Sequence, residues 1–152
     1  MTGYGRNLED YAMINKVMCL AVVSLMFFAV PGMAGQSEKE KTAVSATEKW
    51  LGIVDEGKYG ESWKEAAEYF RNAVKQEQWE QAMQAVRTPL GKLLSRKVKS
   101  TSYKTFLPGA PDGEYVVIEF DTSFVNKKTA VETVTPMMDK DGNWRVSGYY
   151  IK

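Results

Sequence analysis

The spacing of the apolar residues changes from a helical to an alternating pattern near Gly91 of this 152-residue chain. Between residue 42 and Gly91, apolar residues recur every three to four positions, as on one face of a helix. After Gly91 they alternate with polar residues, and β-branched and aromatic residues become more frequent. The change predicts an α+β domain in which helices pack on one face of an antiparallel sheet.

Three N-terminal helices are expected. Residues 42–56 form the first, and the second begins at Ser62, which forms a capping box with Glu65. A third follows after a break, because the apolar stripe that ends at Val74 is out of phase with the one that starts at Trp79. The expected buried stripe of the third helix is Trp79, Ala82, Met83, Val86 and Leu90.

Four strands are expected at residues 92–106, 114–125, 129–138 and 143–152. Short turns join them, so they form an antiparallel meander. The face of the second strand that should meet the helices is Val116, Ile118, Phe120, Thr122 and Phe124. In the last strand, one face is expected to hold Trp144, Val146, Gly148 and Tyr150, opposite Arg145, Ser147, Tyr149 and Ile151. The predicted core brings together Trp50, Trp63, Trp79 and Phe120.

The N-terminal residues 1–34 are typical of a cleavable signal peptide. Lys16 precedes an apolar run, Pro31-Gly32 ends it, and cleavage is expected after Ala34. An uncleaved membrane anchor is the disfavoured alternative, because the run is shorter than the roughly 20 residues of a bilayer-spanning helix. Met13 is an alternative start. We therefore expect a periplasmic or secreted protein with a flexible spacer at residues 35–41, one domain at 42–152, and no membrane span after cleavage.

Missing residue types exclude several kinds of chemistry. The chain has no histidine, and its one cysteine, Cys19, lies inside the apolar run of the signal peptide. Histidine-based catalysis and ordinary zinc sites are therefore excluded, and no metal or other cofactor is expected. Asp139-Lys140-Asp141-Gly142-Asn143 resembles the start of a calcium loop, but Tyr150 occupies the position of the required bidentate acid, which favours a hairpin turn.

Residues 87–104 contain six basic residues and no acid. They are Arg87, Lys92, Arg96, Lys97, Lys99 and Lys104. A solvated strand edge, on which lysines hinder edge-to-edge aggregation, is the favoured interpretation. The alternative is a surface that docks an anionic cell-wall component or lipid headgroup. Nucleic acid is not expected as a partner, because no aromatic ladder accompanies the charges.

A second polar group is expected on adjacent strands, where Glu132, Arg145 and Tyr149 lie with Glu119 and Asp121 nearby. An arginine and carboxylates at a pocket mouth can orient a polar ligand. Ordinary cross-strand ion pairs on the exposed face are the favoured alternative. The candidate ligand-binding residues are Arg87, Glu132, Arg145 and Tyr149.

Long stretches of the chain resemble a bacterial exported family, domain of unknown function 4019. These stretches are TEKWLGIVDEGKYGESWKEAAEYF, QWEQAMQAVRTPLGK, LPGAPDGEYVVIEFDTSF and AVETVTPMMDKDGNWRVSGYYI. The order of elements is also similar to the cystatin-like or nuclear transport factor 2-like fold. That resemblance implies a curved sheet around a cone-shaped cavity, which relatives use for catalysis, binding or dimerisation.

Three functional hypotheses follow. The preferred one is a non-catalytic exported module that holds a small apolar ligand or a protein partner in a cavity between helices and sheet. The second is an isomerase or hydratase that uses Glu132 as a base and Tyr149 to stabilise an oxyanion. The third is a structural homodimer formed through an open sheet face that contains Tyr115, Val117, Val131 and Tyr149.

Overall fold

The structure is a computed structural model that describes the backbone of residues 31–152 and the side chains from residue 37 onward. The expected signal peptide, residues 1–34, lies outside the described residues except for its last four positions. Within the described part, no helix combines the length and the apolar character needed to cross a bilayer.

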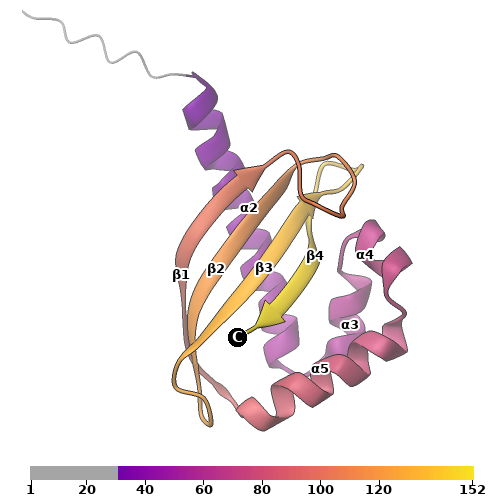
Figure 1. Cartoon of the computed structure of the whole chain (residues 1–152), viewed down its shortest axis with the longest axis vertical. Coiled ribbons are helices and arrows are strands. Elements are labelled where there is room, and N and C mark those ends of the chain that lie inside the picture. The colour runs from indigo at the N-terminus through magenta and orange to yellow at the C-terminus, as the bar shows by residue number, and fades with distance from the viewer. Residues whose placement is uncertain (1–30) are drawn as a thin grey trace, which may run out of the picture. The chain divides into compact units, whose positions relative to one another are not determined.

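The described residues form four helices followed by four strands (Figure 1). The helices are α2 (Pro31–Asp55), α3 (Tyr59–Lys64), α4 (Glu68–Ala73) and α5 (Gln76–Leu90). The strands are β1 (Leu93–Lys104), β2 (Tyr115–Phe124), β3 (Ala130–Met138) and β4 (Trp144–Ile151). They make one antiparallel sheet in the order β1-β2-β3-β4, so the predicted α+β class and meander are confirmed. Helix α2 contacts all four strands and crosses one face of the sheet.

In place of the second expected helix, the structure has two short helices, α3 and α4. It therefore describes four helices where three were expected. The chain leaves the helical conformation at Ala67, whose backbone N–H donates a hydrogen bond to the Val146 carbonyl of β4 at 2.9 Å. Ser62 lies inside α3 rather than at an N-cap. Its buried hydroxyl accepts a hydrogen bond from the Trp79 indole at 3.0 Å, and its carbonyl accepts one from Trp50 at 2.7 Å.

Helix α2 includes residues 35–41, which the sequence had suggested as a spacer. Two long polar side chains in this stretch reach the sheet. Lys39 Nζ lies 2.7 Å from Glu114 Oε1, and a Glu40 carboxylate oxygen accepts the Tyr103 backbone N–H at 3.1 Å. These polar contacts attach to the sheet a helical segment that lacks an apolar period.

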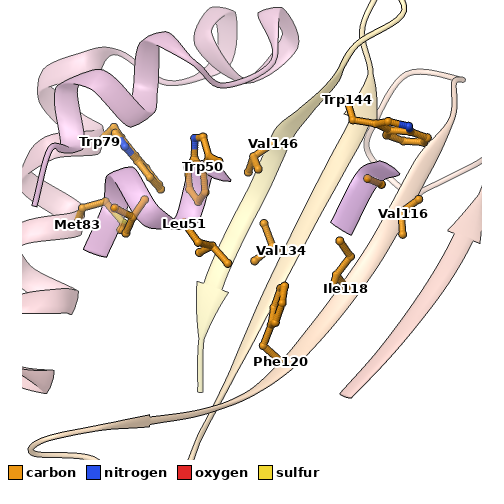
Figure 2. Packing of buried hydrophobic residues seen from close by; sticks show 12 residues of the cluster. Trp50, Leu51, Trp79, Met83, Val116, Ile118, Phe120, Val134, Trp144 and Val146 are labelled. Atoms are coloured by element: carbon orange, nitrogen blue, oxygen red, sulfur yellow. The ribbon is translucent and has the colours of Figure 1, made fainter. Parts of the chain in front are cut away.

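The core lies between α2, α5 and the inner face of the sheet (Figure 2). Trp50, Trp79 and Phe120 are buried in it, and Trp63 packs against its margin, as predicted. The predicted inner face of β2 is confirmed, because all five of its residues are buried. The predicted stripe of α5 is partly wrong: its buried residues are Trp79, Met83 and Arg87, whereas Ala82 is exposed and Val86 is 46% exposed.

A β-bulge changes the expected faces of β4. Thr135 pairs with Gly148 and Pro136 pairs with Val146, so Ser147 between them has no partner on β3. One extra residue in a strand reverses the side of every residue beyond it. Tyr149 therefore joins Trp144 and Val146 on the core face, and Tyr150 points outward.

The face expected to form a homodimer is therefore not continuous. Tyr149 belongs to the core face, where its ring makes edge contacts with Trp50 and Trp79 at centroid separations of 5.7 Å and 6.3 Å. Tyr115 is buried, packs against Leu107, and donates a hydrogen bond from its hydroxyl to the Pro111 carbonyl at 2.5 Å. The segment between β1 and β2 thus covers one end of the outer face.

Candidate functional site

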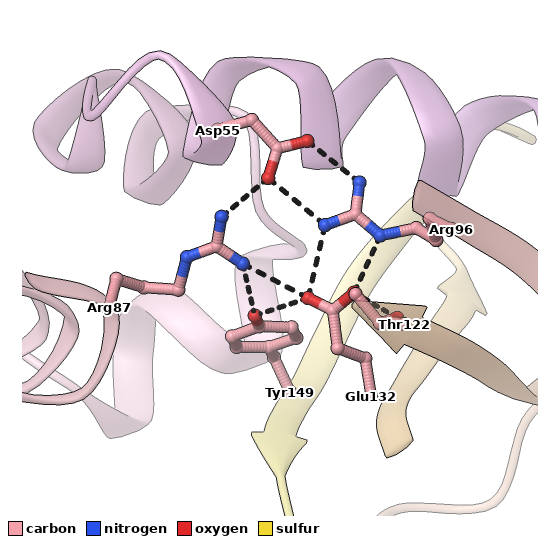
Figure 3. Close-up of polar contacts among 6 residues, drawn as sticks. All are labelled: Asp55, Arg87, Arg96, Thr122, Glu132 and Tyr149. Atoms are coloured by element: carbon pink, nitrogen blue, oxygen red, sulfur yellow. Dashed lines mark hydrogen bonds and ion pairs between the residues drawn. The ribbon is translucent and has the colours of Figure 1, made fainter. Parts of the chain in front are cut away.

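Six polar side chains, each from a different helix or strand, meet near the C-terminal end of α2 (Figure 3). They are Asp55 of α2, Arg87 of α5, Arg96 of β1, Thr122 of β2, Glu132 of β3 and Tyr149 of β4. We call these six residues the ion cluster. It contains three of the four predicted ligand-binding residues: Arg87, Glu132 and Tyr149.

The sheet register places four of these side chains on the inner face. Arg96 lies opposite Thr122, and Glu132 lies opposite Phe120, whose ring is in the core. Directly paired residues of an antiparallel sheet point to the same side. These side chains therefore face the helices, and the bulge in β4 brings Tyr149 to that side as well.

The two helices contribute one charge each. Asp55 is the last residue of α2. Arg87 follows Trp79 and Met83 at intervals of one helical turn, so it lies on the same buried face of α5. Because Trp79 and Met83 pack in the core, the guanidinium group of Arg87 on the same helix face is buried as well.

Glu132 is fully buried and accepts five hydrogen bonds. Its Oε1 accepts from Tyr149 at 2.7 Å and from Arg87 and Arg96 at 3.1 Å each. Its Oε2 accepts from Arg96 Nε at 2.6 Å and from Thr122 at 2.7 Å. A carboxylate has about four lone-pair positions. The protein's own donors therefore use all the accepting capacity of Glu132.

Asp55 completes the pairing of both arginines. Arg96 donates to its two oxygens at 2.7 Å and 3.0 Å, and Arg87 donates at 2.6 Å. The guanidinium of Arg87 also stacks 4.7 Å from the centre of the Phe124 ring. Two positive and two negative groups thus balance inside the fold, and each guanidinium contacts both carboxylates.

The surroundings shift the pKa values of three groups in the cluster. Burial alone would lower the pKa of Arg96, but hydrogen bonds to Asp55 and Glu132 outweigh burial and raise it. The pKa of Arg87 is also raised, because its interactions with Tyr149 and the two carboxylates exceed the effect of burial. Burial, and then the Glu132 charge, raise the pKa of the Tyr149 phenol well above its ordinary value. Tyr149 is therefore a neutral donor whose proton is directed at Glu132.

This geometry suits a structural role better than acid-base chemistry. A general base needs a lone pair that a substrate can reach, whereas all five donors around Glu132 belong to the protein. The Tyr149 hydroxyl donates to Glu132 and accepts from Arg87 at 3.2 Å, so it has no free proton for an oxyanion. Within residues 37–152, no group of three or more side chains is arranged to hold a metal ion.

Arg145, the fourth predicted site residue, lies outside the cluster. It is ion-paired with Asp139 at 3.2 Å and with Asp141 at 2.7 Å beside the β3–β4 turn. Hydrogen bonds from Arg145, and then from Asn143, hold the pKa of Asp141 well below its usual range. Gly142, with φ of 80°, makes the predicted hairpin turn, so these acids stabilise a turn.

Sequence reasoning did not connect Asp55, Arg96 or Thr122 with the site. Thr122 was correctly placed on the inner face, and Arg96 was counted in the basic run. The two basic residue types in that run behave differently: Arg87 and Arg96 turn inward, whereas Lys92, Lys97, Lys99 and Lys104 are exposed. The planar guanidinium group is the one suited to buried bidentate pairing, so residue type was an available signal.

A separate groove of about 490 Å³ lies between α2, α3 and β4. Its apolar floor includes Trp50, Ile53 and Val146. Its rim carries charges of both signs from Lys49, Glu61, Glu65 and Arg145. Within the described part of the chain, the first three rim charges make no ion pair. In this groove, half-buried Ala46 and Ile53 and the edges of the nearly buried Trp50 and Val146 lie among unpaired charges.

Comparison with known proteins gives a family but no activity. Residues 46–149 match a family described as "Protein of unknown function (DUF4019)", a span that includes the whole ion cluster and most of the groove. No curated protein and no solved structure matches the chain. The cystatin-like arrangement expected from the order of elements therefore stays a prediction.

Proposed function

The chain belongs to the DUF4019 family, whose description assigns no activity, and from its site geometry we propose that it is a non-catalytic, exported binding module. Its ligand is a small molecule with a mainly apolar body, held in the groove between α2, α3 and β4. This proposal keeps the binding site between helices and sheet, as the sequence suggested, but places it at their margin rather than in the interior.

The contents of the interior support a margin site. The space between α2, α5 and the sheet holds Trp50, Trp79 and Phe120, together with the ion cluster. A ligand there would have to displace buried aromatic rings or separate buried ion pairs, and either change costs several kcal/mol. The groove is open without such changes.

The saturation of Glu132 counts against the enzymatic alternative. An isomerase or hydratase would need Glu132 to accept a proton from a substrate, but its five hydrogen bonds leave no accepting position. Activity would require at least one arginine to move away and leave a charge unpaired in the interior.

Unpaired charges lie around an apolar floor in this groove, and this combination supports ligand binding. Small-molecule sites are mainly apolar concavities of about 300–1,000 Å³ with a few polar groups that fix orientation. The groove, at about 490 Å³, has that size. Half-buried Ala46 and Ile53 offer apolar contact, while the exposed Lys49 and Glu61 are free to orient polar groups of the ligand.

Native mass spectrometry of the protein as recovered from cells tests this function. We expect a bound small molecule in the wild-type protein and its loss in Ala46→Trp, because Ala46 lines the groove and an indole ring would fill it. Ala82→Trp is the matched control, since Ala82 is an exposed helical alanine on α5 outside the groove. Absence of any bound species, or its equal retention in both variants, contradicts the proposal.

Export is a separate part of the proposal. It is supported by the apolar run of residues 17–30, followed by Pro31-Gly32 and Ala34. N-terminal sequencing of the protein from the periplasm or the medium should begin at Gly35. Lys39 and Glu40 would then remain in the mature chain with their contacts to the sheet. Recovery of only the unprocessed chain, inside the cell, would overturn export.

A further inference from the structure

The end of the sheet where β1 and β3 begin and β2 ends is built from segments without acidic residues. Residues 87–98, 122–131 and 146–152 contain no Asp or Glu. The exposed Asp121 of β2 borders this end and lies 3.8 Å from Lys99. They come together because Val125 donates a backbone hydrogen bond to the Lys92 carbonyl, and Val131 donates one to Lys152, each at 2.9 Å. Asp55 and Glu56 at the end of α2 are already ion-paired, with arginines and with Lys58 respectively.

Three aliphatic side chains protrude at this end. Leu94 is 54% exposed, and Val86 and Val125 are each 46% exposed. Leu93 pairs with Phe124 and Ser95 pairs with Ser123, so Leu94 is the unpaired residue of a bulge in the edge strand β1. The Asn126 backbone N–H donates to the Leu90 carbonyl at 2.9 Å, which brings the end of α5 beside the β2–β3 turn.

Exposed lysines lie close in the sequence to these aliphatic side chains. Lys92 starts the segment that enters β1, and Lys127 and Lys128 form the β2–β3 turn; all three are exposed. None of the three makes an ion pair with a described residue. We call the set of Lys92, Leu94, Val125, Lys127 and Lys128 the basic end. It is locally cationic although the formal net charge of the whole chain is only +1.

We infer that the basic end docks the domain onto the surface of an anionic phospholipid bilayer. Unpaired lysines attract anionic headgroups, and aliphatic side chains between them enter the boundary between headgroups and acyl chains. A nucleic acid fits less well, because binding of single strands uses a series of stacking rings, whereas Tyr150, beside Lys152 at this end of the sheet, is a single exposed ring outside the basic end. A neutral protein surface would leave the lysine charges without partners. This inference does not depend on the proposed ligand groove.

Flotation of the protein with vesicles tests the inference. Vesicles of equal parts phosphatidylglycerol and phosphatidylcholine should bind the wild-type chain, whereas vesicles of phosphatidylcholine alone should bind it weakly. Each lysine close to an anionic surface strengthens binding by about fivefold. The variant with Lys127→Glu and Lys128→Glu should therefore bind the anionic vesicles at least about tenfold more weakly.

Matched controls distinguish an effect of the basic end from an effect of overall charge. Residues 1–30 are the same in every variant, so differences between the variants do not come from them. Lys64→Glu with Lys104→Glu makes the same charge change at two exposed, unpaired lysines elsewhere, and should bind like the wild type. Leu94→Ser should weaken binding, whereas Phe106→Ser, at a residue 63% exposed at the other end of β1, should not. Equal binding of the two double variants, or no loss in Leu94→Ser, overturns the inference.

Discussion

Arg96 and Glu132 are joined by two hydrogen bonds, from Nε to Oε2 at 2.6 Å and from Nη2 to Oε1 at 3.1 Å, although their strands are not neighbours in the sheet. The guanidinium group reaches from the edge strand β1 across Thr122 of β2 to Glu132 of β3. It also binds Asp55 of α2. One arginine thus connects the first described helix with the sheet, and the ion cluster fixes the relative positions of both layers.

Loss of the Glu132 charge should destabilise the fold strongly. In Glu132→Gln, the two arginines retain Asp55 but lose the second carboxylate, and removal of one partner from a buried ion pair costs about 3–5 kcal/mol. The free energy of unfolding in urea measures the loss. Glu119→Gln is the control, because the described contacts of the Glu119 carboxylate are an exposed 3.4 Å hydrogen bond from Ser100 and a 3.9 Å contact with Lys99. Its effect should be below about 0.5 kcal/mol, and similar losses in the two variants would argue against a structural ion cluster.

Two buried threonines should respond in opposite directions to the same substitution. The Thr122 hydroxyl donates to Glu132 at 2.7 Å, whereas within the described part of the chain the Thr47 hydroxyl has no hydrogen-bond partner. Thr122→Val should lower the free energy of unfolding by about 1–3 kcal/mol, and Thr47→Val should raise it by about 1 kcal/mol. Denaturant titration of both variants decides the matter, and a shift of the same sign in both would contradict the assigned hydrogen bonds.

The sequence predicted the parts of the fold that depend on periodicity. The change of pattern near Gly91, the meander and the inner face of β2 are all present. Alternation could not locate the bulge at Ser147, because one extra residue leaves the polar and apolar pattern of a short strand ambiguous. Because the prediction lacked this bulge, it placed Tyr149 on the outer face of the sheet. With the bulge, Tyr149 lies on the core face, and the predicted dimer surface is discontinuous.

The candidate site was only partly predictable for a different reason. Arg87, Glu132 and Tyr149 were identified, but their partners Asp55 and Arg96 are distant in the sequence and meet only after folding. A charged residue on a buried helix face breaks the apolar period that such predictions use, which is why Val86 was expected in the core in place of Arg87.

Alkaline pH should weaken the fold through Tyr149. Burial and the Glu132 charge raise the pKa of Tyr149 above its value in the unfolded chain. Its contribution to stability is therefore complete below about pH 10 and is lost as the pH rises further. Unfolding monitored by circular dichroism should depend less on alkaline pH in Tyr149→Phe. Tyr150→Phe, on the outer face, should retain the wild-type dependence, and identical curves for all three proteins would contradict the placement of Tyr149.

Acidic pH should weaken the ion pair between Arg145 and Asp141 beside the β3–β4 turn. Arg145, followed by Asn143, lowers the pKa of Asp141 below its unfolded value, so the interaction stabilises the fold above about pH 4 and is lost as the pH falls further. The Asp141 carboxyl resonance in NMR should titrate below the ordinary aspartate range in the wild-type protein. It should move toward that range in Arg145→Gln. An unchanged titration would show that Arg145 does not control Asp141.

Ligand binding at the groove should leave the ion cluster closed. Hydrogen exchange measured by mass spectrometry tests it, by comparing the protein as recovered from cells with the same protein refolded after bound molecules are removed. Removal should speed exchange in α2 around Trp50 and in β4 around Val146, with no change around Glu132. Unchanged exchange at the groove, or faster exchange confined to strand β3 at Glu132, would show that the groove is not the binding site.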